Sequence, residues 1–123
     1  MDESTSVGAH NFTLIKSFLS DLVGRLDIDS GHTRMGLVKF SSNVNTDGAF
    51  NLNAYSSVAD VQSAISSLAY VLGRTNTAAA LAYVRTTMLT SAAGDRPDVP
   101  NVVAVMTDGK SNVNVGQTSV SRV

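Results

Sequence analysis

Apolar residues recur at helical spacing in three stretches of the chain. The first runs from about Asn11 to Leu26, and the second follows Ser57-Val58-Ala59-Asp60, which matches a helix capping box. The third extends from about Thr77 to Leu89. The pattern predicts three amphipathic helices, whose inward faces are Ile15, Phe18, Leu19, Leu22, Val23 and Leu26; Val61, Ala64, Ile65 and Leu68; and Leu81, Val84, Met88 and Leu89.

Three other stretches are typical of β-strands. Met35–Phe40 is largely apolar, whereas Val44–Leu52 is interrupted by Asn, Asp and Gly, which favours an edge position. Val102–Met106 is an unbroken apolar run, as expected for a central parallel strand covered on both faces. Strands that alternate with helices predict an α/β fold with a doubly wound, mostly parallel sheet flanked by helices. The ten residues before the first helix leave no room for a strand there.

Composition narrows the function classes. The 123 residues suit one domain, and only 15% of them are charged, against about 25% in an average protein. A formal net charge of −1 argues against a nucleic-acid-binding surface, which needs clustered positive charge. No apolar stretch approaches the length of a membrane span. The absence of cysteine excludes disulfides, zinc–thiolate sites and a thiol nucleophile.

Three polar motifs lie where a doubly wound sheet gathers the carboxyl ends of its strands. Asp2, Ser4 and Ser6 alternate, so their oxygens can converge on a hard cation such as Mg²⁺. Gly73–Thr77 precedes a helix, and Thr107–Gly109 follows an apolar run. Each motif also has a purely structural interpretation. The first can be a polar terminus with a helix cap, and the second a glycine turn in which Thr75 or Thr77 caps the helix. The third can be a simple Asp-Gly turn.

Taken together, these motifs resemble those of the von Willebrand factor type A family, which includes integrin inserted domains and the modules of matrilins and collagens. The residues that carry the resemblance are Asp2-x-Ser4-x-Ser6, Arg34–Ser41, Leu72–Ala78, Arg96–Asn101 and Val103–Gly109. They cover essentially the whole chain in the family's order. The resemblance implies that residues 1–123 form a von Willebrand A fold with a metal-ion-dependent adhesion site.

The resemblance also implies a role for each site residue. Ser4 and Ser6 would bind Mg²⁺ or Mn²⁺ directly, and Asp2 and Asp108 would hold its water ligands or touch it. Thr75 would enter the shell when a ligand is bound. The surrounding loop residues would be Gly73, Arg74 and Gly109.

The function implied is that of a cation-dependent, non-enzymatic protein-binding module in the extracellular matrix. Its partner would offer an Asp or Glu carboxylate and would be a matrix protein such as collagen, or a receptor. One alternative is a structural matrix module of the same fold with an idle metal site. The other is a degenerate P-loop NTPase or phosphatase, since Ala104–Ser111 misses the P-loop pattern by one glycine.

The sequence departs from the family pattern in two respects. Glu3 stands where many members have a small residue, which adds a carboxylate beside the site and is expected to tune its metal affinity. The first strand and the last helices and strands of the family have no counterpart, so we expect a partial domain in which Met1 ends the first strand. His10 and His32 are isolated, and the sequon at Asn11 falls at a helix start, which leaves its glycosylation open.

Overall fold

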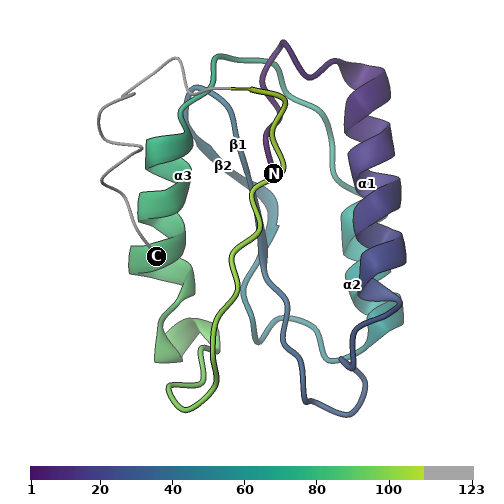
Figure 1. Ribbon diagram of the computed structural model, residues 1–123, viewed down its shortest axis with the longest axis vertical. Coiled ribbons are helices and arrows are strands. Elements are labelled where there is room, and N and C mark those ends of the chain that lie inside the picture. The colour runs from purple at the N-terminus through teal and green to yellow at the C-terminus, as the bar shows by residue number, and fades with distance from the viewer. Residues whose placement is uncertain (110–123) are drawn as a thin grey trace.

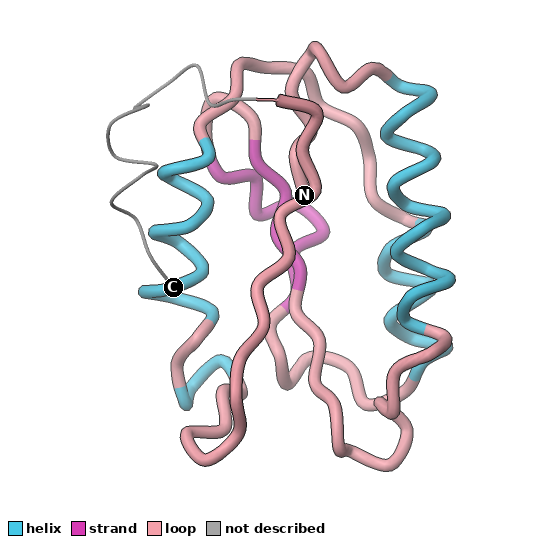
Figure 2. The backbone as a smooth tube through the Cα atoms, in the orientation of Figure 1, coloured by secondary structure: helices cyan, strands magenta, loops and turns pink. Residues whose placement is uncertain are grey.

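The computed structural model describes residues 1–109. Its elements are α1 (Ala9–Val23), β1 (Leu37–Phe40), β2 (Val44–Phe50), α2 (Val58–Ser66) and α3 (Thr77–Tyr83), followed by a π-helical turn (Val84–Met88) and a 3-10 turn (Ser91–Ala93). Figure 1 shows α1 and α2 on one side of the strands and α3 on the other. Figure 2 separates the same helices and strands from the long loops between them. This layered arrangement of helices around strands confirms the α/β class.

The sheet within residues 1–109 consists of β1 and β2, which pair antiparallel with Leu37 opposite Phe50 and Phe40 opposite Val44. Only Ser41–Asn43 connects these strands, and so short a connection permits antiparallel pairing only. The described residues therefore do not confirm a mostly parallel sheet. The edge character predicted for the second strand fits its largely exposed middle residues.

The start of the chain lies along β1, although the sequence was expected to leave no room for a strand there. The Met1 amino group donates to the Val38 carbonyl at 3.0 Å, and the Phe40 N–H donates to the Met1 carbonyl at 3.0 Å. Asp2 and Phe40 form a parallel bridge. Within residues 1–109 no strand precedes α1, as expected, but the first residues are long enough to form these hydrogen bonds beside β1. Burial lowers the pKa of the Met1 amino group to about 6, an effect that Asp2 and Glu3 partly oppose.

The prediction of a buried strand at Val102–Met106 was wrong. None of these residues belongs to a strand, and the Val102 side chain is 92% exposed. The segment is hydrogen-bonded to the chain start at Met106, whose carbonyl accepts a 2.8 Å hydrogen bond from the Asp2 N–H. An apolar run is buried on both faces only where other elements cover it, and the described residues leave one side of this segment uncovered.

The helices on the α1 side form the main core. Phe12, Leu19 and Val23 of α1 are buried together with Val61 and Ile65 of α2. The predicted cap of α2 is confirmed, because the Asp60 N–H donates to the Ser57 hydroxyl at 3.1 Å. Phe18 was placed on the inward face of α1 by its spacing, but it is 55% exposed. The apolar stripe is therefore narrower than the sequence predicts.

α3 is shorter than the predicted helix. Its α-helical part ends at Tyr83, and the chain continues as the π-helical turn Val84–Met88. Its cap is Asn76, whose side-chain oxygen accepts from the Ala79 N–H at 3.2 Å. Neither Thr75 nor Thr77 takes the capping role that the structural interpretation gave them.

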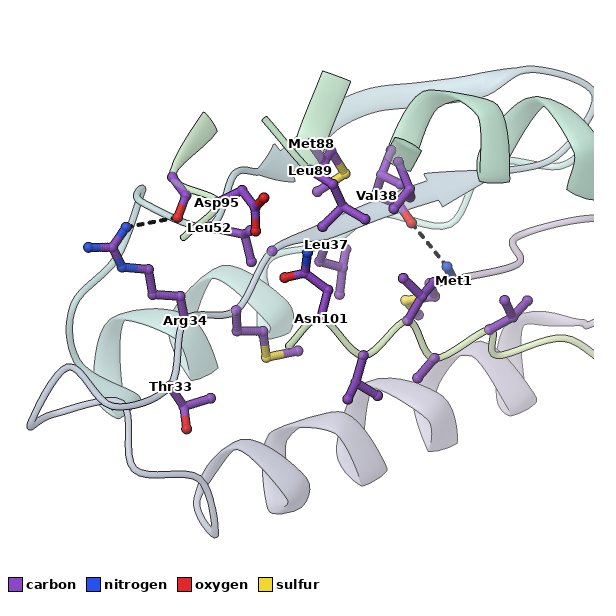
Figure 3. A pocket seen from close by; sticks show the side chains of 18 of the residues that line it. Met1, Thr33, Arg34, Leu37, Val38, Leu52, Met88, Leu89, Asp95 and Asn101 are labelled. Atoms are coloured by element: carbon purple, nitrogen blue, oxygen red, sulfur yellow. Dashed lines mark hydrogen bonds between the residues drawn. The ribbon is translucent and has the colours of Figure 1, made fainter. Parts of the chain in front are cut away.

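An apolar cavity of about 620 Å³ is lined by residues of α1, α3, β1 and the segment 101–106. Figure 3 shows Leu37, Met88 and Leu89 among the side chains that line it. Arg34 stands at one end and donates to the Gly94 carbonyl at 2.8 Å. The cavity lining is predominantly hydrocarbon, which makes it unsuitable for a hard cation. Within residues 1–109, no helix has both the length and the hydropathy needed to cross a bilayer.

Candidate metal centre

The chain start supplies three oxygen-bearing side chains, with Asp2 and Ser4 on an extended stretch and Ser6 in the turn that follows it. Asp2 and Ser4 are buried, and the Ser4 N–H donates to Asp2 Oδ1 at 2.8 Å. Ser6 is exposed, and its hydroxyl lies 3.2 Å from that of Ser4, with either oxygen able to donate. The predicted convergence of the three alternating side chains is therefore present in the geometry.

The segment after Met106 brings a second set of oxygens to the same place. The Ser6 hydroxyl donates to Asp108 Oδ1 at 3.3 Å, and the Thr107 hydroxyl donates to Asp2 Oδ2 at 2.6 Å. The Gly109 N–H donates in turn to Thr107 Oγ1 at 3.3 Å. Residues separated by about a hundred positions in the sequence thus form one connected polar cluster.

Thr107 is a member of the cluster that the sequence analysis did not single out. It was quoted as part of the Thr107–Gly109 motif, but no role was given to it. In the structure its hydroxyl donates a hydrogen bond to the second oxygen of the buried Asp2 carboxylate. Because both Asp2 oxygens accept hydrogen bonds, the Asp2 side chain is held in one orientation.

The loop before α3 approaches this cluster from a third direction. The Thr5 N–H donates to the Gly73 carbonyl at 2.8 Å, and the Gly73 N–H donates to Thr5 Oγ1 at 3.2 Å. The Arg74 N–H donates to the Ser42 hydroxyl at 2.8 Å. Thr75 is buried in this loop. The loop before α3 is therefore hydrogen-bonded both to the chain start, at Thr5, and to the β1–β2 turn, at Ser42.

The predicted residues thus divide into two groups. Asp2, Ser4, Ser6 and Asp108 belong to the hydrogen-bonded cluster. The others lie in two flanking segments, with Gly73, Arg74 and Thr75 in the loop before α3 and Gly109 after the apolar run.

The expectation that Glu3 adds a carboxylate beside the site was wrong. Glu3 is buried and pairs with Lys39, with 2.9 Å between Oε2 and Nζ. Its other oxygen, Oε1, accepts from Asn45 Nδ2 at 2.7 Å. Alternation along an extended backbone sends the Glu3 side chain away from the side that Asp2 and Ser4 share.

The donor set suits a hard divalent cation. Hydroxyl and carboxylate oxygens are the ligands that Mg²⁺ and Mn²⁺ prefer. In residues 1–109, no three His, Cys, Asp or Glu side chains gather in a way that could hold a metal. Any cation held by this cluster would therefore depend on neutral hydroxyls as much as on carboxylates.

The family model for the von Willebrand factor type A domain matches residues 1–123. The chain belongs to this family. It is 38% identical to the collagen alpha-4(VI) chain of Mus musculus over 94% of its length and 5% of that protein. It is also 39% identical to von Willebrand factor A domain-containing protein 1 of Bos taurus and 38% identical to matrilin-4 of Homo sapiens, covering 28% and 19% of those proteins. The chain therefore spans less than a third of each of these curated relatives.

Solved structures of a mussel byssus protein, proximal thread matrix protein 1, share the fold. One superposes with a TM-score of 0.82 at 30% identity, covering 91% of this chain and 29% of that one. Another, described with a zinc-occupied MIDAS motif, has a TM-score of 0.82 at 25% identity and covers 98% of this chain and 34% of that one.

Proposed function

We propose that the chain is a divalent-cation-dependent protein-binding module that takes Mg²⁺ or Mn²⁺. The observation that carries the proposal is the cluster in which Ser4, Ser6 and Asp108 are joined by hydrogen bonds around the buried Asp2. In this proposal Ser4 and Ser6 bind the cation directly, while Asp2 and Asp108 bind it or its water ligands. The zinc-occupied motif in the byssus protein supports a metal at this place in the fold.

The chemistry of the donor set indicates what kind of partner the site would take. When bound, the cation would supply uncancelled positive charge, since the serine hydroxyls that hold it are neutral. An Asp or Glu carboxylate of a partner protein is the complementary group. Gly73, Arg74 and Gly109 flank the cluster and would form the surface around that contact, with Thr75 buried among them.

The relatives suggest where the module works. Collagen alpha-4(VI) and matrilin-4 are matrix proteins by name, and the byssus protein is a thread matrix protein. We infer an extracellular location for this chain and a matrix protein, such as a collagen, as its partner. A structural matrix module of the same fold, with an idle metal site, is the alternative that a binding experiment must separate.

Titration with Mn²⁺ tests the metal site. We expect Asp2→Ala to abolish Mn²⁺ binding measured by calorimetry, because it removes the carboxylate that organises Ser4 and Thr107. Asp108→Ala should weaken it at least tenfold, and since this side chain is exposed we expect the variant to fold. Asp21→Ala, an exposed carboxylate on α1, is the matched control and should bind as the native chain does.

Native affinity in folded Asp2→Ala and Asp108→Ala variants would contradict the site assignment. Binding to immobilised collagen, measured in Mn²⁺ and again in EDTA, then separates the adhesive module from the structural one. The adhesive module loses collagen binding in EDTA. A module with an idle site binds equally in both.

A further inference from the structure

Glu3 and Lys39 form an ion pair in the interior, outside the oxygen cluster. The Glu3 side chain is 0% exposed and that of Lys39 1%. Removing two charges from water opposes the attraction between them, so a buried pair of this kind contributes little net stability. The contacts that the pair makes with its surroundings point to another role.

Both members of the pair bind the backbone of one short segment. Lys39 Nζ donates to the Ala69 carbonyl at 2.6 Å. The Val71 N–H donates to Glu3 Oε2 at 3.2 Å. The pair therefore holds two alternate residues of the segment 69–71 against β1 and the chain start.

The segment 69–71 and the residues just after it are also hydrogen-bonded to the chain start, at Ser4 and Thr5. The Tyr70 hydroxyl donates to the Ser4 carbonyl at 2.8 Å. Two residues beyond Val71, the Gly73 carbonyl accepts from the Thr5 N–H at 2.8 Å. The chain from Ala69 to Gly73 thus runs beside residues 3–5 with fixed register, and Thr75 lies two residues beyond Gly73.

We propose that Glu3 is a positioning residue for the cation site and that Lys39 balances its buried charge. The hydrogen bond from the Val71 N–H to Glu3 Oε2 fixes the distance between the chain start, which carries Asp2 and Ser4, and the loop that carries Thr75. Neither side chain touches the cation. This inference rests on the proposed function, because the role it assigns is at the cation site. The placement of residues 69–75 can be tested separately from that role.

Two double variants test this role at equal net charge. Glu3→Leu with Lys39→Met removes both charges and leaves the Val71 N–H without its acceptor. Glu3→Gln with Lys39→Met also removes both charges, but the carboxamide introduced at position 3 keeps an acceptor for that N–H and can pair with Asn45 if the Asn45 amide flips. Both avoid an unpaired buried charge, which would itself be strongly destabilising.

The readouts are the exchange rate of the Val71 amide hydrogen and the Kd for Mn²⁺, both in the full chain. We expect the leucine double variant to exchange Val71 at least tenfold faster than the native chain and to bind Mn²⁺ at least tenfold more weakly. The glutamine double variant should stay within about threefold of native in both, since a bond to Val71 persists. A pair without a positioning role would leave the Mn²⁺ affinity of the two variants alike, even where their Val71 exchange rates differ.

Equal exchange rates in the two variants would overturn the proposal, as would native Mn²⁺ affinity in the leucine variant. A native chain that binds no Mn²⁺ would refute the proposed function, and the exchange comparison would then decide the positioning role. If the leucine variant does not fold, Asn45→Ala replaces it, because it removes the donor to Glu3 Oε1. Its exposed neighbour Asn43→Ala is the control, and Val71 exchange must be faster in Asn45→Ala than in that control.

Discussion

The hydroxyl of Tyr70 lies between the start of the chain, at Ser4, and the start of α1. It donates to the Ser4 carbonyl at 2.8 Å and accepts from the Gly8 N–H at 3.0 Å. Its ring packs against that of Phe12, with 4.9 Å between the ring centroids. One side chain therefore satisfies two backbone groups at the point where the chain leaves the site and enters a helix.

Replacing Tyr70 by Phe removes both hydrogen bonds and keeps the ring contact. We expect a loss of about 1–3 kcal/mol in the free energy of unfolding, because a partly buried N–H and a carbonyl lose their partner. Urea denaturation measures this loss. Tyr55→Phe is the control, since its exposed ring meets Phe50 edge-on and that contact is retained. Equal stability of the two variants would contradict the role given to the Tyr70 hydroxyl.

Thr75 is the residue whose replacement separates adhesion from scaffolding. If its hydroxyl joins the cation only when a partner carboxylate is bound, Thr75→Ala should weaken binding to immobilised collagen tenfold or more, about 1.4 kcal/mol. The Mn²⁺ affinity without collagen should stay close to native. The check is a pair of titrations on one variant, first with Mn²⁺ and then with collagen. Equal loss in both would make Thr75 an ordinary structural ligand.

At the scale of elements, the β1–β2 turn supports the loop before α3. The Asn76 N–H donates to the Ser41 carbonyl at 2.8 Å, and the Arg74 N–H donates to the Ser42 hydroxyl at 2.8 Å. Gly73 lies against the same turn, where an added Cβ would come within 2.6 Å of Ser41 Oγ. The loop can follow this path only because residue 73 has no side chain.

Gly73→Ala should therefore displace the loop. We expect a loss of about 1–3 kcal/mol in stability, typical of overpacking, together with weaker binding at the cation site. Gly109→Ala is the matched control for folding, because no atom of residues 1–109 lies within 4 Å of its added Cβ. Thermal unfolding and chemical shifts of residues 74–76 provide the measurements. A native-like Gly73→Ala spectrum would contradict the steric argument.

The hydrophobic pattern predicted α1, α2 and both strands of the hairpin to within a few residues, whereas the α-helical part of α3 ends at Tyr83 and not near Leu89. It failed for Val102–Met106, because an apolar run does not indicate whether neighbouring elements cover it. The comparison with the family's motif placed Glu3 beside the metal site, since the sequence does not reveal that Lys39 lies across from it. Alternation along an extended chain is a local property, so it placed Asp2 and Ser4 together, but it did not reveal the turn that brings Ser6 to them or the contact made by Thr107. Whether these oxygens hold a cation stays a prediction.

At the scale of the whole molecule, apolar surface is distributed unevenly. A closed core lies between α1 and α2, whereas α1, α3, β1 and the segment 101–106 leave a cavity of about 620 Å³ between them. In that segment Val102 is 92% exposed and Val105 is 41% exposed. Exposed strand-like segments of this composition are prone to pair with other chains.

We therefore expect the 123-residue chain to bind a hydrophobic dye and to self-associate. Sedimentation velocity and dye fluorescence measure the two effects. Val102→Asp should reduce both, because it places charge on the most exposed apolar position of the segment. Asn101→Asp adds the same charge one residue away, at a polar position, and serves as control. A monomer with a sharp cooperative melt and no dye binding would contradict this expectation.

The alternation at the start of the chain assigns different tasks to neighbouring positions. Asp2 and Ser4 face the oxygen cluster, while Glu3 between them faces Lys39. Ligand chemistry and chain placement can therefore be varied separately in a mutant library. Positions 3 and 39 must be randomised together to retain charge balance, whereas positions 4 and 6 can be exchanged among small polar residues alone. A library built in this way would sample new metal preferences without first losing the folded chain.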